Sequence, residues 1–254
     1  MSERASGKRQ VVVLILVSVF FLAIGVAVTL PLFHSEDKAA TDASYNYLRK
    51  GTNPPSLLPD DLTATIVKEN EAWVANGPVT KKQLAEFARD HKPVDQLKLR
   101  SSDVGAKELS ALNEDCGLRI LRVYNSDLDR EALQVLSSIK SLRALVLEDN
   151  RLSPGYIRSL TGPAELTTLV INKNEIDGRF LEHLKSAFPA LEVLDISRTL
   201  IKFDELEALT AQPKLRELRL YGCPNISAAD AAALRKKMPK VTIYHGDWGD
   251  QWKH

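Results

Sequence analysis

The hydrophobic residues of this chain recur at a fixed interval. The stretch LRALVLEDNRL, Leu142 to Leu152, has apolar residues at its positions 1, 4, 6 and 11 and an asparagine at position 9. Similar stretches begin 24 or 25 residues apart, at Val94, Leu118, Leu166, Leu191 and Leu215. Self-similarity at a fixed period of this length is the signature of a solenoid, in which successive units stack on one another.

Each unit predicts a short strand, a turn, a helix and a return. Apolar positions 1, 4 and 6 send alternating strand side chains inward. Positions 16 and 19 have the spacing of a helix with one buried edge, and they hold Leu109 and Leu112, Leu133 and Leu136, Ile157 and Leu160, Leu181 and Leu184, Leu206 and Leu209. Residues suited to begin a helix follow the apolar residue of position 11, namely Asp129, Ser153, Asp177 and Ser227, and Pro154 fits the first helical position.

The position-9 residue lies where the chain turns off the strand. This position holds Ser126, Asn150, Asn174, Thr199 and Cys223 in successive units. A polar side chain there can satisfy the backbone groups that a tight turn leaves unpaired. Because a strand–helix unit of this size cannot bury its apolar edge alone, we expect parallel stacking with strands inside, helices outside and a curved sheet.

These motifs resemble the leucine-rich repeat family, LxxLxLxxNxL, and they cover residues 94–243 with about six repeats and a closing strand. The stretch LRLYGCPNIS is similar to the cysteine-containing subtype, and the helical back resembles the ribonuclease-inhibitor subtype. The end, LRKKMPKVTIYHGDW, is similar to the closing repeat of bacterial relatives, whereas the first repeat departs from the pattern at Ser102 and Gly105. The resemblance implies an α/β solenoid whose concave sheet binds other macromolecules, usually proteins.

Residues 59–93 predict a helical cap on the first repeat. Acidic residues after Pro59 suit a helix start, with Leu62, Ile66 and Trp73 on its apolar face. A second helix is predicted after Thr80, because Thr80 and Gln83 have the spacing of a capping box. Solenoids need atypical terminal units to close their ends.

Residues 11–33 form the longest apolar run, 23 residues without a charge. As a helix this run is about 34 Å long, enough to cross a hydrocarbon core of about 30 Å. Basic residues precede it and HSEDK follows it, which predicts a single-pass anchor with residues 1–10 in the cytosol and the repeats in the periplasm or cell exterior. The alternative is a cleaved signal peptide, with Gly25 and Ala27 at a small-x-small site.

The segments on either side of the folded part differ in character. Residues 34–58 are polar and rich in turn residues, which is typical of a flexible linker. The tail, residues 244–254, combines His245, Asp247, Asp250 and His254 with Trp248 and Trp252. Its spacing matches no strong metal motif, so we interpret the tail as a cap over the last repeat and expect no metal or cofactor.

Composition and charge argue against nucleic-acid binding, and the spacing of the cysteines argues against a disulfide. The chain is 44% hydrophobic and 26% charged, an ordinary globular composition. Setting aside Glu3, Arg4, Lys8 and Arg9 from the 34 basic and 33 acidic residues leaves 31 and 32, without the basic excess that nucleic-acid binding needs. Cys116 and Cys223 are about four repeats apart, roughly 20 Å at ~4.8 Å per stacked strand, so they are too distant for a disulfide.

The side chains at positions 3, 5 and 7 of each strand point away from the helices and form the predicted binding face. Arginine and tyrosine are enriched at binding hot spots, and valines lie between the two Arg/Tyr ends. The candidate binding residues are Lys98, Arg122, Tyr124, Val146, Glu148, Val170, Asn172, Asp195, Arg219 and Tyr221. The alternative interpretation is that these are ordinary solvated strand residues.

The sequence favours binding over catalysis. It contains no G-x-S-x-G, Walker loop, HExxH or CxxC motif, and His34, His91 and His183 have no evident nucleophile beside them. We therefore expect a non-enzymatic, membrane-tethered module that binds an unidentified protein through its concave face. The alternative function is a structural subunit or assembly factor of a membrane complex.

Overall fold

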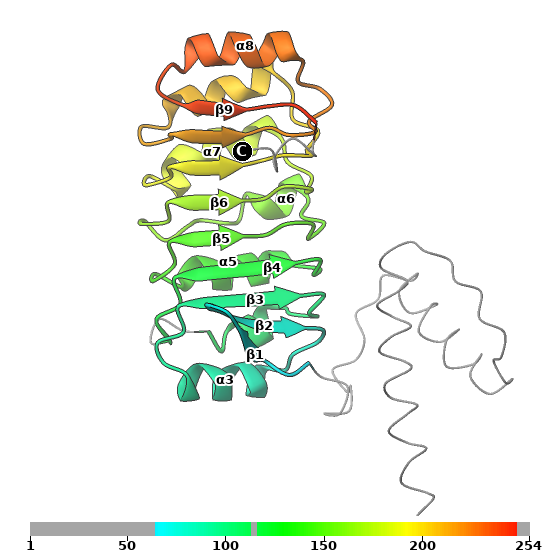
Figure 1. Ribbon diagram of the computed structural model, residues 1–254, viewed down its shortest axis with the longest axis vertical. Helices are drawn as coiled ribbons and strands as arrows, with labels where there is room; N and C mark the ends of the chain where they lie inside the picture. Colours follow the sequence, from blue (N-terminus) through cyan, green and yellow to red (C-terminus); the bar gives the residue numbers. More distant parts are fainter. Residues whose placement is uncertain (1–63, 113–115, 248–254) are drawn as a thin grey trace, which may run out of the picture. The chain divides into compact units, whose positions relative to one another are not determined.

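The repeats form one sheet in which the order of the strands follows the sequence. The computed structural model describes residues 64–112 and 116–247, all within one compact unit. Strands β2 to β9 pair in parallel, and β1 pairs antiparallel with β2 (Figure 1). The strands are β1 (Val67–Glu69), β2 (Ala72–Asn76), β3 (Gln96–Arg100), β4 (Ile120–Tyr124), β5 (Ala144–Val146), β6 (Thr168–Val170), β7 (Val193–Asp195), β8 (Glu217–Arg219) and β9 (Thr242–Tyr244).

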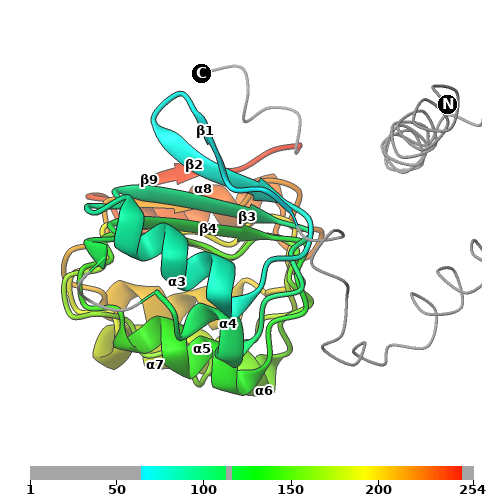
Figure 2. The ribbon, with the colours of Figure 1, turned by 90° about the horizontal axis from the view of Figure 1, so that it is seen from below.

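Helical segments connect successive strands. They are α3 (Lys81–Asp90), α4 (Ala106–Leu109), α5 (Arg130–Ser138), α6 (Pro154–Ile157), α7 (Gly178–Ala187), the 3-10 helix η3 (Asp204–Ala211) and α8 (Ala228–Lys237). Figure 2 shows α3 to α7 on one side of the sheet. Among the described residues, the other side of these strands carries no helix, and we call it the open face.

The helix starts agree with the sequence prediction. The side chains of Asp129, Ser153, Asp177 and Ser227 each accept a hydrogen bond from a backbone N–H in the first turn of their helix. Pro154 begins α6, where its missing N–H removes no helical hydrogen bond. Each cap fixes where the chain leaves the turn and begins its return along the back of the sheet.

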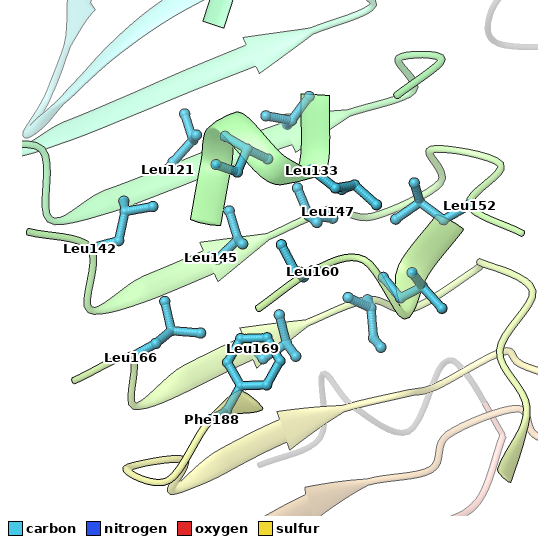
Figure 3. Packing of buried hydrophobic residues seen from close by; sticks show 14 of the residues in the cluster. Leu121, Leu133, Leu142, Leu145, Leu147, Leu152, Leu160, Leu166, Leu169 and Phe188 are labelled. Carbon is cyan, nitrogen blue, oxygen red and sulfur yellow. The ribbon is translucent and has the colours of Figure 1, made fainter. Parts of the chain in front are cut away.

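Leucines fill the space between the sheet and the helices. Inward strand residues such as Leu121, Leu145 and Leu169 are fully buried, and so are the helical pairs predicted at positions 16 and 19 (Figure 3). Burying a leucine side chain stabilises the fold by roughly 1.5–3 kcal/mol, so the stack depends on this repeated burial. Phe188 occupies the core so closely that a Cβ on Gly162 would lie 2.2 Å from its ring.

A ladder of buried asparagines joins neighbouring repeats at position 9. The Asn174 Nδ2 group donates to the carbonyls of Leu147, Ile171 and Asn172 at 2.6 to 3.1 Å. Its Oδ1 accepts from the backbone N–H groups of Asn150 and Leu152, both at 3.1 Å. One side chain therefore satisfies backbone groups in its own repeat and in the preceding one, as the sequence predicted.

The residue before position 9 adopts a left-handed backbone in every repeat. Position 8 has φ between 47° and 64° at Ser101, Asn125, Asp149, Lys173, Arg198 and Gly222. Its N–H donates to the position-7 carbonyl of the next repeat, as in the 3.0 Å bond from Lys173 to Ser197. The sheet pairing thus continues past the end of the strands. The first repeat, despite its departures at Ser102 and Gly105, keeps this geometry.

The prediction of a first cap helix is wrong. In the described part of that region the chain forms the hairpin β1–β2, with Asn70 at φ 55° in a two-residue turn. The β-branched run from Thr65 to Val67 favours a strand, and Asn70 tolerates the left-handed turn. Trp73 packs 5.1 Å from Phe87 and 4.2 Å from His91, measured between ring centroids. The cap is a hairpin and one helix.

The second cap helix is confirmed. Thr80 Oγ1 accepts from the Gln83 N–H at 3.2 Å, and Gln83 Oε1 accepts from the Thr80 N–H at 2.8 Å. These reciprocal bonds are the predicted capping box at the start of α3. The chain from Leu84 to Ala88 then buries its apolar side against the first repeat.

The predicted anchor at residues 11–33, the linker and the end of the tail lie outside the described residues. Within residues 64–112 and 116–247, no helix is long and apolar enough to cross a bilayer.

Replacing Asn174 by alanine should destabilise the chain by at least about 3 kcal/mol. The change leaves several buried carbonyl and N–H groups without their partner, and each such group costs about 1–3 kcal/mol. Urea unfolding followed by circular dichroism measures the difference. The exposed neighbour Glu175→Ala is the control and should change the free energy of unfolding by less than about 0.5 kcal/mol. Equal stability of the two variants would contradict the structural role of the ladder.

Candidate protein-binding face

The strand register aligns the outward residues of successive repeats into rows. The central row contains Lys98, Arg122, Val146, Val170, Asp195 and Arg219, each paired with the next across the sheet. Adjacent members are about 4.8 Å apart, the spacing of neighbouring strands. A second row, from position 7, contains Arg100, Tyr124, Glu148, Asn172, Ser197 and Tyr221. All ten candidate residues from the sequence lie in these two rows.

The first two strands of the repeats carry the basic end of the open face. Arg122 Nη1 donates to Gln96 Oε1 at 3.0 Å. The Arg100 guanidinium lies 5.6 Å from the centre of the Tyr124 ring, within the range of a cation–π interaction. Burial, opposed in part by the nearby arginines, raises the pKa of the Tyr124 hydroxyl. This end therefore combines cations with an uncharged aromatic ring.

The middle of the open face is apolar and bordered by ion pairs. Val146 and Val170 are half-buried neighbours in the central row. Glu148 Oε1 lies 2.6 Å from Lys173 Nζ, and Glu217 Oε1 lies 2.5 Å from Arg219 Nε. Lys173 was not among the predicted site residues, because it occupies position 8. Lys173 directly follows the outward position 7 of its repeat, and this position could have indicated its ion pair with Glu148.

Three candidate residues are buried, although the sequence predicted outward, accessible side chains. Asn172, Asp195 and Tyr221 are 2%, 5% and 4% exposed. Tyr221 stacks on Tyr244 with ring centroids 6.1 Å apart, and Asp195 Oδ1 accepts from the Ser197 N–H at 2.9 Å. The Asn172 Oδ1 has no hydrogen-bond partner among the described residues. Their direction follows the strand alternation, whereas their burial depends on neighbouring strands.

Burial raises the pKa of the Asp195 carboxyl, and the hydrogen bonds from Ser197 and the charge of Arg219 oppose this effect only in part. The native chain therefore holds this proton more tightly than the unfolded chain does. Ionising Asp195 in the native state costs free energy that an uncharged isostere avoids.

The metal and disulfide predictions concern residues outside these rows. His245 Nε2 lies 2.8 Å from the Ile226 carbonyl oxygen, and the tail residues from Trp248 onward are outside the described part. Residues 64–112 and 116–247 contain no group of three or more potential metal ligands. Cys116 and Cys223 are both buried.

A hollow of about 480 Å³ lies on the helical back, between α7 and η3. Its lining includes the carboxylates Glu182, Asp204 and Glu205. Glu205 accepts hydrogen bonds from the N–H groups of Gly178, at 3.0 Å, and Lys202, at 2.7 Å. This glutamate therefore links the start of α7 to the segment that precedes η3, a structural role.

No family model and no curated protein matches the sequence. Solved structures do match, among them an internalin (inlF) from Listeria monocytogenes, which is 14% identical with a TM-score of 0.47. The alignment covers 82% of this chain and 62% of the internalin chain. The class of fold follows from the repeats themselves. Parallel strand–turn–helix units with buried position-9 side chains define a leucine-rich repeat solenoid.

Replacing Asp195 by asparagine should raise the stability of the chain at pH 7. Because the native pKa lies above the ordinary value of 3.8, the contribution of Asp195 to stability falls as the pH rises from 3.8 through the native pKa and is constant above it. Asparagine keeps the acceptor for the Ser197 N–H and has no charge to bury. Thermal unfolding should show a higher Tm for the variant at pH 7 and a smaller difference below pH 3.8. A variant less stable than wild type at pH 7 would contradict this assignment.

Proposed function

We propose that this chain is a non-enzymatic, membrane-tethered leucine-rich repeat module that binds a protein through the open face of its sheet. The observation that carries the proposal is the open face itself, where basic, aromatic and apolar side chains from strands β3 to β8 form continuous rows. Most of these side chains are only half-buried, so a partner can reach them and cover more of their surface. Arginine and tyrosine are the residue types most enriched at binding hot spots.

The charges on the open face favour binding over catalysis. The carboxylates Glu148 and Glu217 are held in ion pairs, and the Asp195 carboxylate is held by a backbone N–H. Catalytic acids and bases need access to substrate and a neighbouring group to exchange protons with. These carboxylates are instead engaged in contacts within the chain.

The membrane part of the proposal is supported by the sequence. The 23 apolar residues of 11–33 are long enough to span a bilayer, and Arg4, Lys8 and Arg9 precede them. The repeats would then stand in the periplasm or outside the cell, joined to the anchor by the polar linker.

The orientation can be tested with topology reporters fused after His254. Alkaline phosphatase, which is active only outside the cytosol, should be active, and green fluorescent protein exported by the same route should be dark. The basic residues before the apolar run are the physical reason, so changing Arg4, Lys8 and Arg9 to glutamate should reduce the phosphatase signal. An inactive phosphatase fusion together with a fluorescent green fluorescent protein fusion would overturn the proposed orientation. A mature chain beginning near Val28 would show that the segment is a cleaved signal peptide.

The binding surface can be tested with Val170→Arg at the centre of the open face. The long charged side chain should keep the fold within about 0.5 kcal/mol of wild type, because Val170 is half-buried and faces away from the core. It should weaken affinity capture of the native partner from solubilised membranes at least tenfold, since it occupies the apolar centre of the interface. Quantitative mass spectrometry of the captured proteins provides the measurement.

The matched control is Lys185→Glu, an exposed position on helix α7. It changes charge on the helical back and should leave capture unchanged. If the control abolished capture while Val170→Arg bound normally, the binding surface would be the helical side. Co-purification in a fixed stoichiometry with the same membrane proteins, unaffected by either variant, would favour a structural subunit instead.

A further inference from the structure

Positive charge is concentrated at one end of the open face. Lys98 and Arg100 come from β3, and Arg122 comes from β4 opposite Lys98. Their observed partners carry no negative charge, since Arg122 binds the Gln96 amide and Arg100 lies over the Tyr124 ring. Among the described residues, no carboxylate lies within ion-pair distance of these three cations. The basic end therefore lacks a direct counter-charge.

The rest of the open face is internally compensated. Glu148 is paired with Lys173, and Arg219 with Glu217. The positive charge of Arg219 favours the ionised form of Asp195, and Asp195 Oδ1 accepts a hydrogen bond from the Ser197 N–H. Among the described residues of the two rows, the positive charge that an incoming anion would meet without a paired carboxylate lies on β3 and β4. This difference makes the two ends of the face chemically distinct.

The environment of Lys98 shows that the cations destabilise one another. Its pKa is lowered first by burial and then by repulsion from Arg100 and Arg122, while Glu69 in the hairpin acts weakly in the opposite direction. Nearby like charges disfavour the protonated ammonium. An anion bound above these three side chains would relieve the repulsion and favour the charged lysine.

The surface beside the cations is apolar. Ile120, Val146 and Val170 lie on β4, β5 and β6, on the same side of the sheet as Arg122. From the Lys98–Arg122 pair to the Val146–Val170 pair is two strand spacings, roughly 10 Å. A ligand that fits both parts must carry negative charge and an apolar group about this distance apart.

We propose that the partner presents an acidic polypeptide segment, whose carboxylates lie above Lys98, Arg100 and Arg122 and whose apolar side chain covers Val146 and Val170. This inference rests on the proposed function, because it assumes that the open face is the binding surface. A polypeptide fits better than a nucleic acid, since three cations can neutralise only a few phosphates and the valines beside them would have no apolar partner on a phosphate backbone. A sulfated polysaccharide would leave the valines uncovered by apolar groups.

A library of random 12-residue peptides displayed on phage tests this chemistry against the full-length chain in detergent. Wild type should select peptides enriched in aspartate and glutamate beside an apolar residue. Lys98→Glu/Arg122→Glu should lose these peptides, with affinity for a synthetic copy of the best one falling at least tenfold, which is 1.4 kcal/mol. The double variant should select basic peptides instead. Lys98→Gln/Arg122→Gln should lose the acidic preference without gaining a basic one.

The affinity of the best acidic peptide should also fall as salt rises from 50 to 300 mM, and this dependence should be weaker in the Lys98→Gln/Arg122→Gln variant. Lys185→Glu on the helical back is the control and should select the same peptides as wild type. Far-UV circular dichroism and thermal melts check that each variant keeps its fold.

Several outcomes would overturn the acidic-segment proposal. They are a selection that yields no binder, selected peptides without acidic enrichment, or an unchanged preference in Lys98→Glu/Arg122→Glu. Tighter binding of a single-stranded DNA oligonucleotide or a sulfated polysaccharide than of any peptide would also overturn it. If Val170→Arg still abolished capture of the native partner, the open face would remain the binding surface and only its chemistry would be wrong. If neither change affected binding, the proposed function would fail as well.

Discussion

The buried amide at position 9 is the interaction on which the rest of the solenoid depends. Each strand must end in a turn whose carbonyls point into the stack, where water cannot reach them. The side chains of Asn150 and Asn174 satisfy these carbonyls and the N–H groups of the adjacent repeat at once. Thr199 Oγ1 and Cys223 Sγ each donate one hydrogen bond to the Ile196 carbonyl. These two side chains therefore make fewer hydrogen bonds to the backbone than Asn150 and Asn174 do. Repeat spacing, strand register and the rows on the open face all follow from this connection.

The fold was largely predictable because the same constraint is written several times in the sequence. A leucine at position 4 and a hydrogen-bonding residue at position 9 recur together, so each repeat confirms the register of the next. The N-terminal cap occurs once and has no such support. Its apolar residues Ile66 and Trp73 fit a helical spacing, whereas the β-branched residues and Asn70 favour a hairpin. The second strand of this hairpin, β2, pairs with β3 at the edge of the sheet. Pairing with an available sheet edge outweighed the local pattern.

The sequence was enough to predict which side chains point to the open face, but not how deeply each of them is buried. Strand alternation places Arg122 and Asp195 in one row without further information. It does not show that Asp195 is nearly enclosed while Arg122 is half-exposed, because enclosure depends on neighbours from other repeats. The Glu148–Lys173 pair joins position 7 of one repeat to position 8 of the next. Such contacts require the left-handed turn geometry, which the sequence pattern of one repeat does not specify.

The repeats also accommodate an extra residue without disturbing the rows. The unit that begins at Leu166 is one residue longer than its neighbours, and helix α7 has 10 residues where α5 has 9. In the unit that begins at Leu215, the extra residue falls before Ile226 and the helix cap moves to Ser227. In both cases the strand pairing is unchanged, with Val170 opposite Asp195 and Arg219 opposite Tyr244. Length variation is confined to the turns and helices because a one-residue slip in a strand would send its leucines to the open face. The order of chemistry along the open face is therefore fixed by the order of the repeats, which keeps the basic end and the apolar centre side by side.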